Sequence, residues 1–288
     1  MKSNYDILGN HIRLIDTRNR ESITDRVLGI NIDKFFMPSV ANVIGTDLSK
    51  YKLITKGKFA CNPMHVGRDE RLPVALYDEE EPAIVSPAYF MFEVVDNSIL
   101  NEDYLMMWFR RPEFDRICWL HTDGSVRGGI TWDDICRLEL PIPPIENQLE
   151  IVNSYKAITE RIALKQKIND NLDDTAQTLY QKYFESNSDK SSWKQGTVGD
   201  VLQLQRGHDL PRTEMTGGKY PVAGSTGTIG YHDEFTAEAP VIVMGRSGNI
   251  GNPRLYLCNC WTHNTSLYVK QIYEAEPLWV FYLLKNLN

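Results

Sequence analysis

The sequence lacks the long apolar run that a membrane span requires, because no stretch approaches 18 consecutive apolar residues. It also has no apolar segment behind its first lysine, so we expect neither a signal peptide nor a membrane segment. The five cysteines form no Cys-x-x-Cys pair, and their odd number is typical of reduced thiols in a cytoplasm. Cys258 and Cys260 resemble same-face neighbours on a strand, but without a second pair they predict no metal site. We therefore expect a cytoplasmic protein.

The usual catalytic signatures are missing as well. No His-Glu-x-x-His, Gly-x-Ser-x-Gly or P-loop sequence occurs. No lysine follows an acidic residue at a distance of two, as the end of many nuclease sites requires. The segment Asn62-Pro63-Met64-His65 departs at two places from the Pro-Pro-aromatic motif of amino-methyltransferases. An enzyme, either a methyltransferase or a nuclease, is therefore the less favoured interpretation, and we expect no catalytic residues.

An excess of basic residues is also absent. The chain carries 31 Lys and Arg against 38 Asp and Glu, a formal net charge of −7, and residues 191–288 balance at 8 against 8. Proteins that bind nucleic acid without sequence preference are usually basic. Any DNA contact must therefore depend on local groups of side chains, or on a partner that supplies most of the phosphate contacts.

The most regular feature present is a long helical pattern in the middle of the chain. Residues 145–184 contain no Gly or Pro, and their apolar residues recur mostly at spacings of three and four. Pro141, Pro143 and Pro144 hold the preceding chain extended, and Pro144 suits a first helical turn. About 40 residues make a rod of about 60 Å. The polar stretch 185–192 then predicts the end of the helix.

An apolar stripe of this length needs a partner helix of similar length. One alternative is an ordinary long helix packed on its own domain. The spacing favours the other alternative, in which the helix is half of an antiparallel coiled coil. The second half then lies elsewhere in the chain or on another chain, including a second copy. The candidate subunit or helix interface consists of Ile151, Tyr155, Ile158, Ile162, Ile168, Leu172, Leu179 and Tyr183.

The regions on either side of this helix resemble each other. Leu8-Gly9-Asn10 aligns with Val198-Gly199-Asp200 at an offset of 190 residues, and each predicts a short strand reached through a Gly turn. Farther along each half, a β-rich run is followed by a helical segment. These runs and helices are 86–92 and 101–110 in the first half, and 264–269 and 276–285 in the second. We interpret this order as a diverged tandem duplication whose second copy is incomplete.

Several segments together resemble the specificity (S) subunits of type I restriction-modification systems. The most specific is the Pro-Ile-Pro-Pro-x-x-x-Gln run at Leu140 to Gln148, followed by the long helix with KINDNL and LYQKYF. A second is Gly-x-x-Arg-x-x-Ile-x-Trp-Asp-Asp-Ile at 124–135. A third is VIVMGRSGNIGNP followed by WTHNTSLYV in the second half. The resemblance covers nearly the whole chain, but a full S subunit would carry a complete second domain and a second conserved helix.

The resemblance implies an α+β fold with two small mixed α/β target-recognition domains separated by one long coiled-coil-type helix. The expected parts are a first domain at 1–143, a spacer helix at 144–186, a linker at 187–192 and an incomplete second domain at 193–288. Each domain would read one part of a bipartite site in double-stranded DNA.

The same resemblance implies that the chain is non-catalytic and binds no cofactor itself. Methyltransferase (M) subunits would bring S-adenosylmethionine, and restriction (R) subunits, if they join, would bring ATP and Mg. The alternative is a truncated S-like interaction protein that pairs with M or another S chain without productive DNA reading.

Reading base edges needs hydrogen-bonding side chains on loops held by a rigid frame. In the second half, residues 245–251 and 224–230 place polar side chains between glycines, although tight turns between strands are an equal alternative. In the first half, basic residues surround the run 59–71, where solvated surface charge is the alternative. The DNA-binding candidates are Lys56, Lys58, Arg68, Arg71, Arg127, Arg246, Ser247, Asn249 and Asn264.

Overall fold

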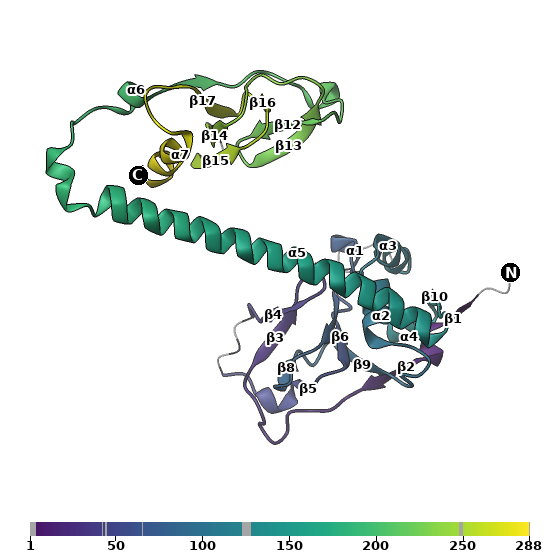
Figure 1. Ribbon diagram of the computed structural model, residues 1–288. Helices are drawn as coiled ribbons and strands as arrows, with labels where there is room; N and C mark the ends of the chain where they lie inside the picture. The colour runs from purple at the N-terminus through teal and green to yellow at the C-terminus, as the bar shows by residue number, and fades with distance from the viewer. Residues whose placement is uncertain are drawn as a thin grey trace. The chain divides into compact units, whose positions relative to one another are not determined.

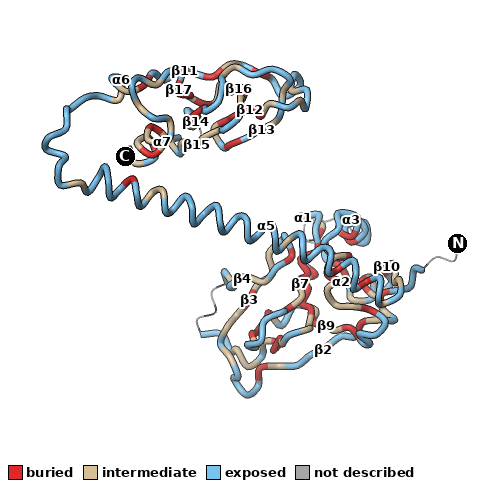
Figure 2. Tube along the Cα trace, viewed as in Figure 1, coloured by how far each residue is buried: buried red, intermediate tan, exposed pale blue. Residues whose placement is uncertain are grey.

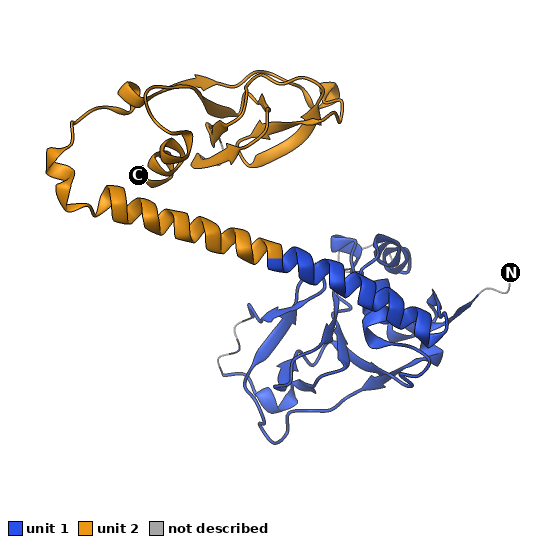
Figure 3. Ribbon diagram, viewed as in Figure 1, with its two compact units in different colours: residues 1–164 blue, residues 165–288 orange. Residues whose placement is uncertain are grey.

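The computed structural model describes residues 4–41, 43, 45–64, 66–122, 128–247 and 250–287. The chain divides into two compact units, residues 1–164 and residues 165–288, with the boundary inside one continuous helix (Figure 3). Both units contain helices and sheets, so the predicted α+β class is confirmed. The predicted boundaries of the domains, spacer and linker stay predictions.

The central helix α5 spans Ile145–Tyr180 and continues into a π-helical turn at Gln181–Glu185 (Figure 1). This matches the region predicted to be helical. Its 36 residues give it a length of about 54 Å. A 3-10 turn at Ser188–Ser192 follows, where the polar stretch predicted that the helix ends. Among the described residues, no helix combines the length and hydropathy needed to cross a membrane.

The first unit is built on two four-stranded sheets. One has the order β2-β9-β6-β7 and is antiparallel throughout, and the other has the order β4-β3-β8-β5, with β3 and β8 parallel. A further strand pair joins the start of the chain to the segment before α5. The strands are β1 (Tyr5–Ile7), β2 (Ile12–Ile15), β3 (Val27–Ile30), β4 (Phe36–Pro38), β5 (Lys52–Ile54), β6 (Lys58–Cys61), β7 (Val74–Tyr77), β8 (Ala83–Val85), β9 (Phe90–Val94) and β10 (Glu139–Pro141).

Side chains of the first sheet alternate between two cores. Phe59 and Phe92 join the core that includes helix residues, whereas their neighbours Ala60 and Met91 join the core shared with the second sheet. The Phe59 and Phe92 rings stack with centroids 5.0 Å apart, and Phe109 meets both rings edge-on. The helices of this unit are α1 (Val66–Asp69), α2 (Glu102–Phe109), α3 (Pro112–Leu120) and α4 (Trp132–Cys136).

The second unit has the same two-core arrangement. Ile242 and Val269 face a core that includes α7, whereas Val241, Val243 and Tyr268 face a core on the other side of the sheet. Its elements are α6 (Val198–Val201), β11 (Leu202–Arg206), β12 (Tyr220–Gly224), β13 (Gly227–His232), β14 (Val241–Gly245), β15 (Gly251–Tyr256), β16 (Trp261–Thr262), β17 (Ser266–Ile272) and α7 (Pro277–Asn286).

The two units share one topology. The sheet order β11-β17-β14-β15 repeats β2-β9-β6-β7, and every neighbouring pair is antiparallel in both. In the other sheet of each unit, β12 pairs with β13 antiparallel and with β16 parallel, as β3 pairs with β4 and β8. In each unit the central strand leads into a helix, β9 into α2 and β17 into α7. This shared order supports the duplication inferred from the sequence.

One predicted feature of the second unit is wrong. Cys258 and Cys260 do not lie on a strand with side chains on one face, because β15 ends at Tyr256 and the chain bends before Cys258. Cys258 is exposed, whereas Cys260 is buried. Burial raises the pKa of the Cys260 thiol to about 12.

Gln148 holds the first turns of α5 on the first unit. Its side chain is fully buried, and its Nε2 donates to the backbone carbonyls of Ile99 (2.8 Å) and Pro143 (2.7 Å). Its Oε1 accepts from the backbone N–H of Asn101 at 2.9 Å. This is the glutamine of the Pro-Pro–Gln segment, so the most specific part of the sequence pattern has a definite structural task.

The other end of α5 is held by α7. The Tyr282 hydroxyl donates to Asp173 at 3.0 Å, and Lys285 forms an ion pair with the same carboxylate at 2.7 Å. The hydrogen bond from Lys285 lowers the pKa of Asp173, whereas burial, followed by the bond to Asp173, raises the pKa of Tyr282 to about 12. The ring of Tyr180 stacks on that of Tyr282, with centroids 6.0 Å apart.

The predicted apolar stripe of α5 is not covered by the described residues. Its eight members are exposed by 38% at Tyr155 to 63% at Ile162, and most of α5 is exposed in Figure 2. The helix instead buries Val152 and Tyr180, which lie outside the stripe. Whether a partner covers the stripe stays a prediction.

We expect Gln148→Ala to destabilise the first unit by roughly 2–4 kcal/mol, because one backbone N–H and two backbone carbonyls, all in partly buried hydrogen bonds, lose their partner. Hydrogen exchange of amides in α2 and β9 would measure the loss. Gln166→Ala is the matched control, since Gln166 is exposed and bonds only to Asp170 on the same helix. The control should change stability by less than about 0.5 kcal/mol. Equal protection in both variants would contradict the expectation.

Candidate nucleic-acid interface

The strand order of the second unit brings several loops to one edge. Because β11 and β14 both run antiparallel to β17, both of them end where β17 begins. The register pairs Arg206 with Leu267 and Gly245 with Ser266. Loops that are distant in sequence therefore meet beside the start of β17. We call this region, made of residues 206–212, 225–226, 246–247 and 263–265, the polar edge.

The smaller sheet adds its own turn to the polar edge. β12 and β16 are parallel, so they end on the same side, with Ala223 paired to Thr262. The backbone N–H of His263 then donates to the Ala223 carbonyl at 2.9 Å. This places the turn at Ser225 and Thr226 beside the segment 263–265. Ser266, fully buried, donates its hydroxyl to the Ala223 carbonyl (3.1 Å) and so ties the two sheets together.

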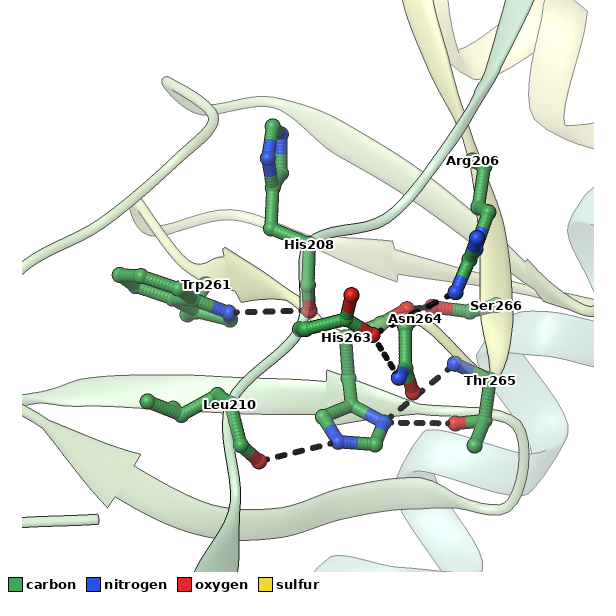
Figure 4. A network of polar contacts seen from close by, with 9 residues as sticks. Arg206, His208, Leu210, Trp261, His263, Asn264, Thr265 and Ser266 are labelled. Atoms are coloured by element: carbon green, nitrogen blue, oxygen red, sulfur yellow. Dashed lines mark hydrogen bonds and ion pairs between the residues drawn. The ribbon is translucent and has the colours of Figure 1, made fainter. Parts of the chain in front are cut away.

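The polar edge contains a connected set of side chains (Figure 4). The Asn264 amide nitrogen donates to Oδ1 of Asp209, and Arg206 lies 3.4 Å from the same oxygen. Asp209 is 73% exposed and Arg206 is 54% exposed, so both are accessible from solvent. The pair joins residues 55 positions apart in the sequence.

His263 holds the segment behind this pair. Its Nε2 lies 3.2 Å from the Leu210 carbonyl, which can only accept, so Nε2 carries the proton in the neutral ring. Nδ1 is then an acceptor for the Thr265 hydroxyl at 2.9 Å. These contacts fix the backbone on either side of Asn264, because His263 and Thr265 are its two neighbours.

A cavity of about 570 Å³ opens at the polar edge. Its wall mixes acceptors, donors and apolar side chains, and includes the guanidinium-bearing Arg212. The lining residues are Asp209, Leu210, Pro211, Arg212, Met215, Ser225, Ile229, His263, Asn264 and Thr265. Such a mixture can contact both the hydrogen-bonding groups and the apolar surface of a base.

The structure brings together three of the candidates predicted in the second half. Asn264 lies at the centre of the polar edge, and Arg246 and Ser247 follow directly after β14. The backbone N–H of Arg246 donates to the Thr265 carbonyl at 3.1 Å, which connects the two loops. Asn249 lies outside the described residues.

The candidates of the first half are not brought together. Lys58 starts β6 and Lys56 precedes it, whereas Arg68 and Arg71 follow the end of β6, at the opposite end of the β6–β7 pair. Each is paired with a carboxylate: Lys56 with Glu80, Lys58 with Glu93, Arg68 with Asp69 and Arg71 with Asp33. Arg127 lies outside the described residues.

These carboxylates stabilise the charged form of their partners. The hydrogen bond to Glu80 raises the pKa of Lys56, and the hydrogen bond to Asp69 raises the pKa of Arg68. Ion pairs this exposed contribute little to stability and exchange readily with water. The cations can therefore bind another anion, but each then leaves its carboxylate without an ion-pair partner.

Two of the predicted loops occupy equivalent places in the two units. The connection from β6 to β7 contains Arg68 and Arg71, and the connection from β14 to β15 contains Arg246 and Ser247. Because β6 corresponds to β14 and β7 to β15, both connections leave the same edge of the shared sheet. Lys56 and Lys58 lie at the other edge, away from this shared position.

Sequence reasoning missed several members of the polar edge. Arg206, Asp209 and Arg212 belong to the run RGHDLPR, which comes directly after a predicted strand. Its density of polar side chains behind a strand was an available signal. The hydrogen bond between Asp209 and Asn264 could not be predicted from the sequence, because it depends on the order of strands in the sheet.

Comparison with known proteins gives relatives of one kind. No family model matches the chain. The chain is 24% identical over 191 residues to the type I restriction enzyme HindI specificity subunit of Haemophilus influenzae, covering 66% of this chain and 40% of that protein. It therefore spans less than half the length of this curated relative.

Solved structures show the same likeness at the level of the fold. The type I restriction-modification S subunit from M. genitalium superposes with a TM-score of 0.62 at 16% identity, covering 99% of this chain and 78% of that one. The HsdS subunit from Thermoanaerobacter tengcongensis gives a TM-score of 0.40 at 14% identity, over 98% and 78%, which is too weak to support an argument. The chain thus has the fold of a type I specificity subunit, and the resemblance inferred from the sequence is confirmed.

We expect Gly207→Ala to disrupt the polar edge. A Cβ on Gly207 would lie 2.1 Å from the His263 carbonyl oxygen and 2.7 Å from that of Thr262, so the backbone behind Asn264 must move. Overpacking of this kind costs about 1–3 kcal/mol. Hydrogen exchange of the amides in β11 and β17 would detect it. Gly199→Ala is the control, because its Cβ would make only an ordinary contact at 3.7 Å. Unchanged exchange in Gly207→Ala would count against this account of the packing.

Proposed function

We propose that this chain is the DNA sequence-specificity subunit of a type I restriction-modification complex. Each unit reads one part of a bipartite site in double-stranded DNA, and together they position methyltransferase subunits on it. The chain itself catalyses nothing. Specificity arises because the correct bases form hydrogen bonds that incorrect bases cannot, a difference of about 1–3 kcal/mol per base pair.

The observation that carries the proposal is the shared topology of the two units. Two copies of one sheet order, joined by a continuous helix, present equivalent loops from the same edge. Duplicated reading domains are what a site with two specific halves requires. The likeness of sequence and fold to type I specificity subunits supports the same function.

The proposed partners follow from this function. M subunits bind S-adenosylmethionine and methylate the site, and R subunits, where they join, use ATP and Mg; the chain binds none of these cofactors. The complex would work in the cytoplasm. The acidic net charge of −7 favours a complex in which the partner subunits provide most contacts to phosphate.

The exposed stripe on α5 supports a partner that covers it. Ile158, Ile162 and Leu172 are each at least 62% exposed, and removing such side chains from water is favourable. M subunits or a second S-type helix, including a second copy of this chain, fit this surface. The stripe alone also suits an S-like protein that occupies M without reading DNA, and the two functions differ in whether methylation occurs.

Methylome sequencing of cells that contain the chain together with its cognate M subunit tests the proposed function. We expect a new methylated motif with two specific parts separated by unread bases, and no such motif without the chain. Stable co-purification with M but no methylated motif would favour the interaction protein instead. Methylation by the isolated chain with S-adenosylmethionine would contradict a non-catalytic role.

We expect Ile162→Asp to weaken assembly with M or with a partner helix at least tenfold, because a charge replaces an apolar side chain at the buried contact. Both units should stay folded, since Ile162 is 63% exposed in the free chain. Asn153→Asp is the matched control. Asn153 is exposed, and the variant adds the same charge nine residues before Ile162, which is the opposite side of the helix. Equal co-purification of both variants would reject the stripe as an interface.

A further inference from the structure

We propose that Asp209 and Asn264 select a base that presents an exocyclic amino group in the major groove, adenine or cytosine, at one position of the DNA site. This inference rests on the proposed function and assigns a chemical preference to the second unit. It concerns which base is accepted, whereas the proposed function concerns only that bases are read.

The orientation of the Asn264 amide follows from its partner. An ionised carboxylate can only accept hydrogen bonds, so Asn264 must turn its NH₂ group toward Asp209. The Arg206 guanidinium donates to the same carboxylate oxygen, at 3.4 Å. Both donors therefore converge on Oδ1, the same one of the two carboxylate oxygens.

This arrangement leaves two acceptors available. Within the described part of the chain, Oδ2 of Asp209 and Oδ1 of Asn264 receive no hydrogen bond from the protein. Both belong to residues that line the cavity at the polar edge. A ligand that enters there meets a pair of oxygens that can only accept, and so must offer N–H donors.

Hydrogen bonds hold the backbone that carries Asn264. Asn264 lies between His263 and Thr265, whose side chains bond to each other and to the Leu210 carbonyl. The next residue, Ser266, is buried and bonds to the Ala223 carbonyl. Base discrimination depends on such fixed geometry, because a mobile acceptor could adapt to the wrong base.

In the major groove, N–H donors belong to two bases only. Adenine presents N6–H₂ beside the N7 acceptor, and cytosine presents N4–H₂, whereas guanine and thymine present oxygen acceptors. Guanine O6 or thymine O4 opposite the Asp209–Asn264 pair would place oxygen against oxygen. The pair thus rejects these bases as well as accepting adenine or cytosine.

The test compares methylated motifs in cells that contain the M subunit with the wild-type full-length chain or a variant. We expect Asp209→Asn and Asn264→Leu to relax the same single position, with discrimination there falling on the order of 10- to 100-fold. At that position the wild-type motif should specify one base pair in one orientation, so that exchanging the two bases between the strands abolishes methylation. All other positions should be unchanged.

Asp233→Asn is the matched control. Asp233 is exposed and follows β13, at the end of that strand away from the turn at 225–226. It should leave the motif unchanged.

An unchanged motif in both test variants would overturn the inference and leave the proposed function standing. Equal weakening at every position would also overturn it, because that pattern indicates contact with phosphate. Absence of any motif with the wild-type chain would instead overturn the proposed function.

Discussion

In both units, the strand that leads into a helix lies between two antiparallel neighbours, and this pairing decides where the loops lie. β9 lies between β2 and β6, and β17 lies between β11 and β14, so in each unit two strands must end where the central one begins. Backbone hydrogen bonds impose this, whatever side chains the loops carry. The sheet can therefore stay constant while the loops at its edge change, which is the condition for reading different bases with one fold.

The second constraint is the anchorage of α5 at its two ends. Gln148 binds three partly buried backbone groups at one end, and Asp173 accepts from two α7 side chains at the other. Polar contacts of this kind have strict geometry, so they specify a rotational position of the helix as well as a contact. The helix can then leave its middle part apolar and exposed. That part needs no role within either unit and is free for a partner.

The parts of the fold that were predictable from the sequence are those encoded locally. Forty residues without Gly or Pro and with 3/4 spacing predict α5, and the recurring segments indicate the common order of elements. The side of α5 that each unit contacts was not predictable. The buried residues Val152 and Tyr180 lie outside the apolar stripe, and their burial depends on tertiary neighbours.

The candidate site shows the same limit. Asn264 was a candidate from the sequence alone, but Asp209, 55 residues away, becomes its neighbour only through strand order. Lys56 and Lys58 looked similar to Arg68 and Arg71 in the sequence, yet the hairpin places them at opposite ends.

The carboxylate partners of the first unit's cations have a consequence for how such a protein searches DNA. A phosphate that replaces Asp33 beside Arg71, or Asp69 beside Arg68, gains a cation but leaves an acidic group nearby, so its net gain is small. Random sequence would be held weakly and released quickly. Only where the bases add their own hydrogen bonds would the complex last longer, so under the proposed function the acidic neighbours would shorten the time spent at wrong sites.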